Sequence, residues 1–333
     1  MTQSLSENLP PSHQDTKNFN AFLRALVTWW LMQRPLQTGS QPLRLLLAIL
    51  LAGCAVLERA PLPTATIQWP TPRAGELAPG ALREWPNDAS PMVFVSSGHF
   101  LQGARPDDEL ASDNERPQHA VYITGFWIDK TEVTNARYAK CVAAGACRPP
   151  LANGSHSRDH YFDDPAYADY PVIFVSWFDA RDYCLWAGKR LLTEAEWERA
   201  ARGDDGRRWP WGDTWDGAKA NFCDSNCVHR WRNESVSDGH TDTAPVGFYP
   251  AGASSFGALD MAGNVWEWVA DEYAAYSADP GIDPLIFDGA DIKVLRGGSY
   301  DFVAPGLRAT YRYEDDATHR QDSFGFRCAV DRP

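Results

Sequence analysis

The sequence has 333 residues, of which 44% are hydrophobic, and it includes 14 tryptophans. This length allows one large domain or two small ones, and the apolar content is ample for a sizeable core. The net charge of −13 argues against a nucleic-acid partner, because phosphate binding requires a basic surface.

An apolar run near the N-terminus, LRLLLAILLAGCAVL at 43–57, predicts a signal region over residues 1–53. The run is shorter than the roughly 20 residues of a membrane-spanning helix, and it suits the h-region of a signal peptide. It ends in Leu51-Ala52-Gly53-Cys54, which is similar to a bacterial lipobox. We therefore predict that Cys54 is acylated and becomes the first residue, which places the protein in the bacterial cell envelope. A buried helix or a signal anchor with an incidental cysteine is the alternative.

The segment before the apolar run is long for a signal peptide, so Met32 is a possible true start. Residues 54–90 follow the predicted lipidation site and are rich in proline, alanine and threonine, without a clear period. This composition predicts an extended tether between the lipid and a globular domain over residues 91–333.

The domain begins with patterns typical of strands. MVFVSSGHFLQG, from Met92, has an alternating apolar run followed by glycine, and VYITGFWID at 121–129 reads as another strand. Thr134 is then a suitable N-cap for a helix, NARYAKCVAA, which Gly145 ends.

Two more helices are predicted from their caps. Ser176 begins one that stops at Gly188. Thr193-Glu194-Ala195-Glu196 is a capping box that starts a helix ending at Gly203. No convincing helix follows, so we predict an α+β domain with few helices and much irregular loop. Long loops of this kind need fastening by a metal or a disulfide.

Several long motifs, in chain order over about 92–331, resemble the formylglycine-generating enzyme (sulfatase-modifying factor) family. They are FWIDKTEVTNARYAKC, PVIFVSWFDARDYCLWAGKRLLTEAEWERAARG, WPWGD, TAPVGFYP, GALDMAGNVWEWVAD, VLRGGSY and FGFRCAV. The resemblance implies a modified C-type-lectin-like fold.

Two positions of this motif set differ from the sulfatase-activating members of the family. The resemblance implies that those members carry a copper-binding cysteine pair where this chain has Phe302 and Leu307. Copper(I) prefers soft thiolate ligands, which neither side chain supplies. We therefore expect no copper cofactor and no formylglycine-generating activity.

The six cysteines beyond Cys54 form an even set, which fits disulfides in an oxidising compartment. The resemblance implies a structural bridge between Cys184 and Cys328. Two other pairs are close in sequence, namely Cys141 with Cys147 and Cys223 with Cys227. We predict three disulfides; the alternative is that some of these thiols stay reduced and buried.

The resemblance also implies one or two structural Ca²⁺ sites, because the cation takes carboxylate and backbone oxygens together. The first would use the side chains of Asp260 and Glu267 with the carbonyls of Gly263 and Val265. The second would use Asn221, Asp238 and backbone oxygens of Phe222 and His240. The alternative is that Asp260 and Glu267 are simply loop-capping acids.

The resemblance places a ligand groove around Tyr300–Arg320. Its predicted residues are Ser299, Tyr300, Asp301, Phe302, Arg308, Tyr311 and Arg312. Aromatic, arginine and carboxylate side chains make a good recognition surface. The alternative is that about half of them belong to the core, with Arg308 and Arg312 in internal pairs.

Three functional hypotheses follow. The favoured one is a lipid-anchored module that binds a peptide, a glycan or an envelope partner protein. The second is an oxidoreductase with a non-cysteine metal or cofactor site, similar to pyoverdine-maturation relatives. The third is a diversified ligand-display protein, since variable proteins share this fold.

Overall fold

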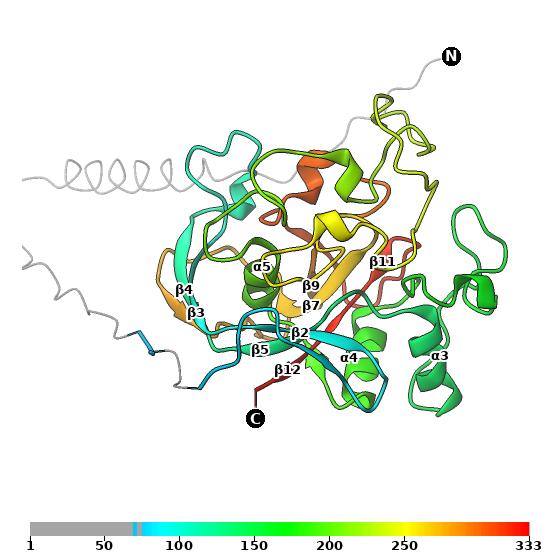
Figure 1. Ribbon diagram of the computed structural model, residues 1–333, viewed down its shortest axis with the longest axis horizontal. Helices are drawn as coiled ribbons and strands as arrows, with labels where there is room; N and C mark the ends of the chain where they lie inside the picture. The colour runs from blue at the N-terminus through cyan, green and yellow to red at the C-terminus, as the bar shows by residue number, and fades with distance from the viewer. Residues whose placement is uncertain (1–68, 72–74, 333) are drawn as a thin grey trace, which may run out of the picture. The chain divides into compact units, whose positions relative to one another are not determined.

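The computed structural model describes residues 69–71 and 75–332 (Figure 1). The chain divides into two units, Met1–Thr66 and Ile67–Pro333, and only the second contains described residues. The predicted signal region, Cys54 and most of the predicted tether therefore lie outside the described residues. Within the described part, no helix has the length and apolar character needed to span a membrane.

Strands and irregular segments dominate the domain, as predicted for an α+β fold. The α-helices are α3 (Asn135–Ala143), α4 (Trp177–Trp186) and α5 (Glu194–Arg202). Short 3₁₀ turns are η1 (Asp113–Glu115), η2 (Pro165–Tyr167), η3 (Gly217–Lys219), η4 (Pro250–Gly252) and η5 (Ala304–Leu307). The strands are β1 (Leu82–Glu84), β2 (Pro91–Val95), β3 (Gly98–Gln102), β4 (His119–Ile123), β5 (Phe126–Asp129), β6 (Arg190–Leu191), β7 (Trp266–Glu272), β8 (Gly281–Ile282), β9 (Ile292–Arg296), β10 (Tyr313–Asp316), β11 (Phe324–Gly325) and β12 (Cys328–Asp331).

These strands form three sheets, ordered β1-β2-β5-β12-β6, β10-β9-β7-β11 and β3-β4-β8. In the first sheet the last strand of the domain, β12, pairs antiparallel with both β5 and β6. The beginning and the end of the domain are thus joined in one sheet, and Figure 1 shows β12 running beside β5.

The three predicted helix starts are confirmed at the level of single hydrogen bonds. Thr134 Oγ1 accepts from the Arg137 amide at 3.3 Å, and Ser176 Oγ accepts from the Asp179 amide at 3.2 Å. At α5 the capping box closes in both directions, because the Thr193 amide also donates to Glu196 at 2.8 Å. Each bond joins residues three apart, so the local sequence is sufficient to predict it.

Two boundaries differ from prediction. The single strand expected over 121–129 is two strands, β4 and β5, in different sheets. They separate at Gly125, where an added Cβ would lie 2.9 Å from the Phe94 ring, so the chain crosses β2 closely there. The folded domain also begins before the predicted residue 91, because β1 pairs with β2.

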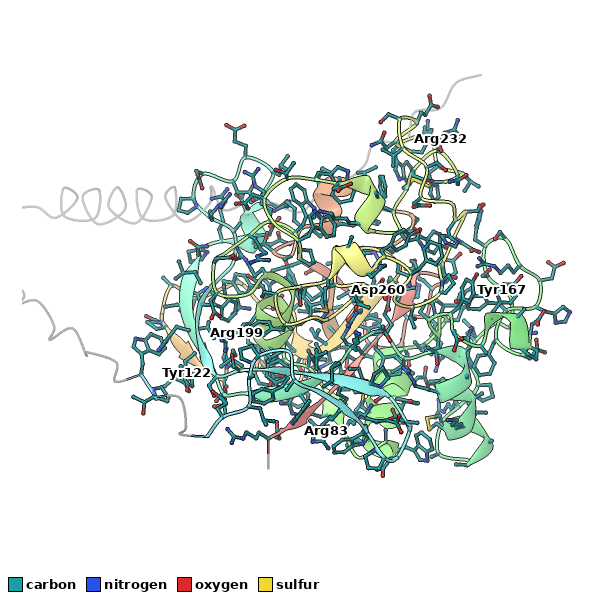
Figure 2. All side chains as sticks on the ribbon, viewed as in Figure 1. Arg83, Tyr122, Tyr167, Arg199, Arg232 and Asp260 are labelled. Atoms are coloured by element: carbon teal, nitrogen blue, oxygen red, sulfur yellow. A yellow bond between two sulfur atoms is a disulfide. The ribbon has the colours of Figure 1, made fainter. Side chains whose placement is uncertain are left out.

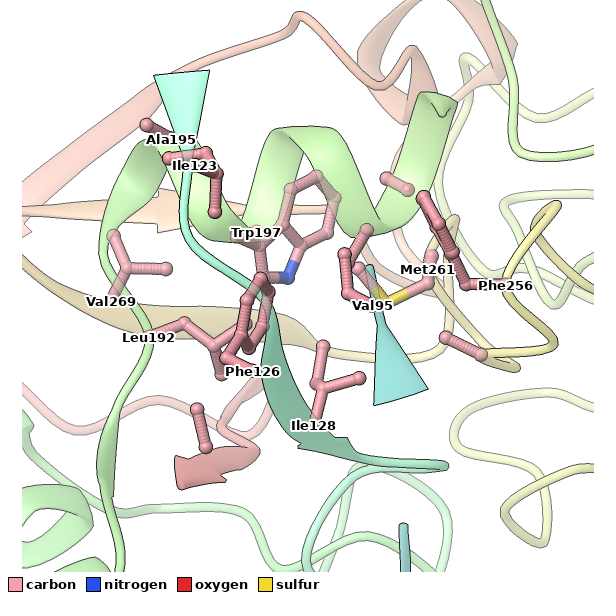
Figure 3. Close-up of a cluster of buried hydrophobic side chains, with 14 of the residues drawn as sticks. Val95, Ile123, Phe126, Ile128, Leu192, Ala195, Trp197, Phe256, Met261 and Val269 are labelled. Carbon is pink, nitrogen blue, oxygen red and sulfur yellow. The ribbon is translucent and has the colours of Figure 1, made fainter. Parts of the chain in front are cut away.

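One apolar cluster packs α5 against strands of all three sheets (Figure 3). The Trp197 ring of α5 is fully buried at its centre, among side chains that include Val95, Ile123, Phe126 and Met261. The indole Nε1 of Trp197 donates to Glu267 Oε2 at 2.9 Å. Burial of this apolar surface holds the sheets together and fixes β7 relative to the helix.

The three predicted disulfides are confirmed. They are Cys184–Cys328, Cys141–Cys147 and Cys223–Cys227. The first joins α4 to β12 across 144 positions, whereas the other two close loops of six and four positions. Ile67–Pro333 is a compact unit, and it contains its own apolar core and all three of these disulfides.

Candidate functional site

The predicted groove residues begin at a double-glycine turn after β9. Gly297 and Gly298 both have positive φ, at 97° and 77°. A Cβ on Gly298 would lie 2.9 Å from both the Gly306 carbonyl oxygen and the Leu307 side chain. Glycine is therefore required for the turn to bring Ser299–Phe302 against the segment that contains Leu307.

Carboxylates gather beyond this turn. Ser299 Oγ donates to the Asp301 carboxylate in a short hydrogen bond, and the hydroxyl of the buried Tyr300 lies against Asp322. Burial and the neighbouring Asp322 raise the pKa of Asp301 above its ordinary value. Burial also raises the pKa of Tyr300, helped by the charges of both aspartates. The cluster therefore carries an excess of negative charge.

A partly exposed aromatic pair lies beside these acids. Trp231 Nε1 donates to the Asp301 carbonyl oxygen at 3.1 Å, and 54% of Trp231 is exposed. His229 stacks on the Trp231 ring, with centroids 4.3 Å apart and planes 5° from parallel. The loop that carries both projects from the domain, as the neighbouring Arg232 shows in Figure 2. The site thus combines carboxylates with an accessible indole face.

Apolar packing occupies the two positions at which the resemblance implied a cysteine pair. Phe302 lies edge-on to Trp266, with ring centroids 5.0 Å apart, and near Tyr311 at 6.3 Å. Leu307 is fully buried in a cluster with Trp209 and Phe222. The two side chains therefore contribute core contacts here and no group that binds copper.

Arg308 and Arg312 do not line an open groove, which corrects the prediction that placed them there. Arg308 is fully buried and forms two bonds of 2.6 Å to Glu115. Arg312 is 3% exposed and binds Glu194 at 2.7 and 2.8 Å. A buried guanidinium requires a carboxylate partner, so both are structural ion pairs, in line with the alternative interpretation. Tyr311 is partly buried and remains beside Phe302.

The first predicted calcium region is deeply buried, and Figure 2 shows Asp260 inside the domain. Asp260 Oδ2 accepts from the Gly247 amide at 2.5 Å. Glu132 lies beside Asp260, and burial raises the pKa of both carboxyls. The Oε2 atom of Glu132 has no hydrogen-bond partner among the described residues. This orphaned oxygen and the paired carboxyls fit a hard cation.

Glu267, in contrast, already has partners for both oxygens. Arg327 donates to Oε1 and to Oε2, each at 2.7 Å, and Trp197 donates to Oε2. Among the residues predicted for this region, Asp260 is therefore the freer carboxylate, and Glu132 accompanies it. Gly263 and Val265, whose backbone carbonyls are the other predicted ligands, follow Asp260 closely in the chain. Gly263 has a φ of 84°.

Residues of the second predicted calcium region lie close together in the structure. Asp238 accepts from the Phe222 amide at 3.0 Å and from the His240 amide at 2.9 Å. Burial raises the pKa of Asp238 to about 7. The buried Oδ1 of Asn221 has no partner within the described residues. The Asp238 carboxylate faces amide hydrogens here, so an oxygen-only cage would need these bonds to open.

Asn264 connects the two regions. Its Nδ2 donates to Glu132 at 3.0 Å, and its Oδ1 accepts from Asn221 at 3.1 Å. Within the described part, no group of three or more His, Cys, Asp or Glu side chains has a geometry that would hold a metal. A cation in either region would therefore depend on amide and backbone oxygens together with the carboxylates.

Some residues of these sites were missed by sequence reasoning. Glu132 lies within the FWIDKTEVTN motif, so its place in a family motif was the available signal. Three other residues lie far in sequence from the Gly297-Gly298 turn, and nothing in the sequence placed them beside it. They are His229, Trp231 and Asp322. Their positions depend on the long loop fastened by Cys223–Cys227 and on the segment before β11.

Comparisons with known proteins agree with this architecture. Residues 80–332 match the family model of the sulfatase-modifying factor enzyme 1-like domain. A formylglycine-generating enzyme of Streptomyces coelicolor is 35% identical over 309 residues, which cover 79% of this chain and 95% of that protein. A hercynine oxygenase of Mycolicibacterium thermoresistibile is 35% identical over 285 residues, which cover 74% of this chain and 60% of that enzyme.

Solved structures show the same arrangement. PvdO from Pseudomonas aeruginosa aligns with a TM-score of 0.64 at 28% identity, over 77% of this chain and all of the other. Variable protein 1 of Treponema denticola aligns with a TM-score of 0.58 at 21% identity, over 76% of this chain and 99% of the other. The second likeness concerns the fold alone.

Proposed function

Because this chain belongs to the sulfatase-modifying factor family, which includes formylglycine-generating enzymes, we propose that it is a lipid-anchored binding protein of the bacterial envelope. Its domain keeps the family fold and binds a ligand without making formylglycine. One observation carries the proposal: Phe302 and Leu307, at the two positions of the cysteine pair, are packed into apolar clusters.

The remaining cysteines support this absence of thiolate chemistry. All six in the described part are joined in disulfides. Copper(I) chemistry needs soft thiolate ligands, and none of these sulfurs is a free thiolate. Ser299 is the hydroxyl nearest the turn, and its proton is directed at Asp301.

The carboxylates beside the double-glycine turn favour a ligand that carries a basic side chain. We therefore propose that the ligand is a peptide or an envelope partner protein. Asp301 and Asp322 raise the local negative charge, and no lysine or arginine forms a salt bridge with Asp301 among the described residues. The nearest basic group is the imidazole of His229. A lysine or arginine would neutralise the pair and stack on the exposed Trp231 face. A neutral glycan would satisfy neither acid as well.

A direct binding experiment tests this assignment. Peptides that contain lysine or arginine are selected from a randomised library, and calorimetry should detect their binding. The same peptides with glutamine at each lysine and arginine position should not bind. Asp301→Asn and Trp231→Ala should each weaken the binding about tenfold, whereas Asp213→Asn, at an exposed aspartate elsewhere, should leave it unchanged. Equal binding of charged and neutral peptides would refute the assignment.

The domain should not convert a sulfatase-type cysteine peptide to formylglycine, even with Cu(I) and oxygen supplied. The physical reason is that an aromatic ring and a buried leucine replace both metal-binding sulfurs. Mass spectrometry of the peptide after incubation provides the measurement, with heat-treated protein as the control. A protein-dependent mass loss matching the conversion would show that another group performs the reaction.

A second candidate function has support from the comparisons. The chain is similar to a hercynine oxygenase and to PvdO, so an oxidoreductase that uses a metal or cofactor held without cysteine is the alternative. Metal analysis after native purification separates the two proposals. A redox metal at one equivalent per chain would favour the oxidoreductase over the binding protein.

The lipid anchor gives a separate prediction. Cys54→Ala should release the protein from membranes or block its processing, because the predicted acylated thiol is removed. Membrane fractionation measures this, with Cys223→Ala/Cys227→Ala as a control that changes cysteine number without touching the lipobox. A Cys54→Ala protein that still sediments with membranes like the unaltered chain would rule out the anchor.

We also propose that Ca²⁺ stabilises the domain, held by Asp260 and Glu132 with the carbonyls of Gly263 and Val265, and by Asn221 in the second region. A chelator should then lower the melting temperature and Ca²⁺ should restore it, because a ligand bound only by the folded state stabilises it. Thermal melts with and without the cation provide the measurement.

Variants connect this calcium effect to the buried acids. Glu132→Gln and Asp260→Asn should each abolish most of the calcium-dependent rise in melting temperature, since they remove the charge that attracts the cation. Glu314→Gln makes the same kind of change on an exposed side chain and should keep the rise. Identical melting temperatures with chelator and with Ca²⁺ would contradict the proposal that the cation stabilises the domain.

A further inference from the structure

A pocket of about 600 Å³ shares no lining residue with Ser299–Phe302, the segment of the predicted groove. One wall is α4, which contributes Trp177, Arg181 and Leu185. The rest of the apolar lining comes from β5, β6, β7 and the segment after β8, through Phe126, Leu191, Ala270, Leu285 and Phe287. This volume lies within the range of about 300–1,000 Å³ that small-molecule sites have.

The apolar wall has one rigid part and one open part. Trp177 is 7% exposed, and its Nε1 donates to the Val269 carbonyl at 2.7 Å, so the ring is fixed. At the mouth, Leu185, Leu285 and Phe287 remain 62%, 53% and 66% exposed. Lys293 Nζ lies 4.7 Å from both the Trp177 and Phe287 ring centroids, which connects the two parts. Exposed apolar side chains gathered around a cavity mark a binding site.

Most of the charged groups of this lining already have partners. Arg190 binds Glu196 at 2.7 Å and Asp331 at 2.5 Å. Asp283 accepts from the amide and the hydroxyl of Thr124, each at 2.7 Å. The pocket therefore gains little from a charged ligand and much from one that buries apolar surface. Its volume also exceeds that of a single inserted side chain, which favours a longer apolar body.

We propose that this pocket binds a single acyl chain. The acyl chain would lie against Trp177 and Ala270. Its polar end would leave the pocket at the mouth, between Leu185, Leu285 and Phe287. Burial of each methylene in such a wall is favourable, and the matched charges at the rim leave the polar end of the lipid in water. The proposed ligand groove shares no residue with this site.

The place where the domain begins indicates where the acyl chain comes from. The pocket is lined by Glu76, near the start of the described domain, and by Asp331 and Arg332, at its end. Cys54, the predicted lipidation site, precedes Glu76 by 22 positions in the sequence. A lipid on Cys54 and the lipids of the surrounding bilayer are therefore the two sources that the experiment must separate. The source therefore rests on the lipid anchor of the proposed function, whereas the pocket itself does not.

The experiment uses the Ile67–Pro333 unit, free of detergent, and cis-parinaric acid, whose fluorescence rises when its chain is buried. We expect saturable binding at one probe per domain. Leu185→Asp/Leu285→Asp should weaken it at least tenfold, because both side chains at the mouth become charged. Leu82→Asp/Leu151→Asp is the matched control at two leucines that are each 66% exposed and do not line the pocket.

A second pair of variants guards against misfolding. Phe287→Ser should weaken binding, whereas Phe248→Ser, at a phenylalanine 53% exposed elsewhere, should not. Thermal melts verify that all variants fold. Absence of saturable binding by the unaltered unit, or full affinity in both pocket variants, would overturn the proposal.

Two further arms separate the sources of the acyl chain. If the chain's own anchor fills the pocket, the full lipidated protein should take up less probe than full-length Cys54→Ala. Equal uptake would assign the pocket to other lipids of the membrane. Failure of the anchor prediction leaves probe binding by the Ile67–Pro333 unit intact, so the two proposals can fail separately.

Discussion

Replacing Cys184 and Cys328 together with alanine should lower the free energy of unfolding by about 2–5 kcal/mol. The bridge joins α4 to β12 across 144 positions, so its loss returns a large loop entropy to the unfolded chain. It also secures β12, the strand that connects β5 with β6 in the largest sheet. Denaturant titration without reductant measures the change.

The matched control is Cys141→Ala/Cys147→Ala. This pair is also buried, but its bridge closes a loop of only six positions. The loop-entropy account predicts a loss of about 2 kcal/mol for the short bridge and up to about 5 for the long one. Equal losses from the two double variants would show that packing around the sulfurs, and not loop closure, provides the stability.

Arg308→Met should destabilise the domain by about 3–5 kcal/mol, because it leaves the buried Glu115 carboxylate without its partner. Both oxygens of Glu115 accept from Arg308 at 2.6 Å, and both side chains are fully buried. Glu115 is in η1 and Arg308 directly follows η5, so the pair also holds the segment beyond the double-glycine turn in place.

Two further variants make this prediction specific. Adding Glu115→Gln to Arg308→Met should recover part of the loss, because the uncompensated charge is then removed. Arg232→Met breaks an exposed pair with Glu234 and should change stability by less than about 1 kcal/mol. Equal effects of Arg308→Met and Arg232→Met in equilibrium unfolding would contradict a structural role for the buried pair.

Interactions between near neighbours were predictable from the sequence alone. The N-caps Thr134, Ser176 and Thr193 bind amides three residues ahead, so four consecutive residues contain the whole interaction. The strand and cap patterns likewise predicted the α+β class, and the resemblance of the motifs to the family implied the Cys184–Cys328 pairing. The sequence also shows Phe302 and Leu307 at the two positions where the resemblance implies a cysteine pair.

Only the tertiary structure decided which distant groups meet. Arg308 appears in the sequence as a groove residue, yet it is buried because Glu115, 193 positions earlier, lies opposite it. Packing of distant segments also brings Glu132 beside Asp260. The apolar pocket likewise combines residues of α4, of β7 and of the segment at Asp331 and Arg332. Local patterns report hydrogen bonds and periodicity within a few residues. The partners of a buried charge and the walls of a cavity depend on how the sheets pack, and that packing is a property of the whole chain.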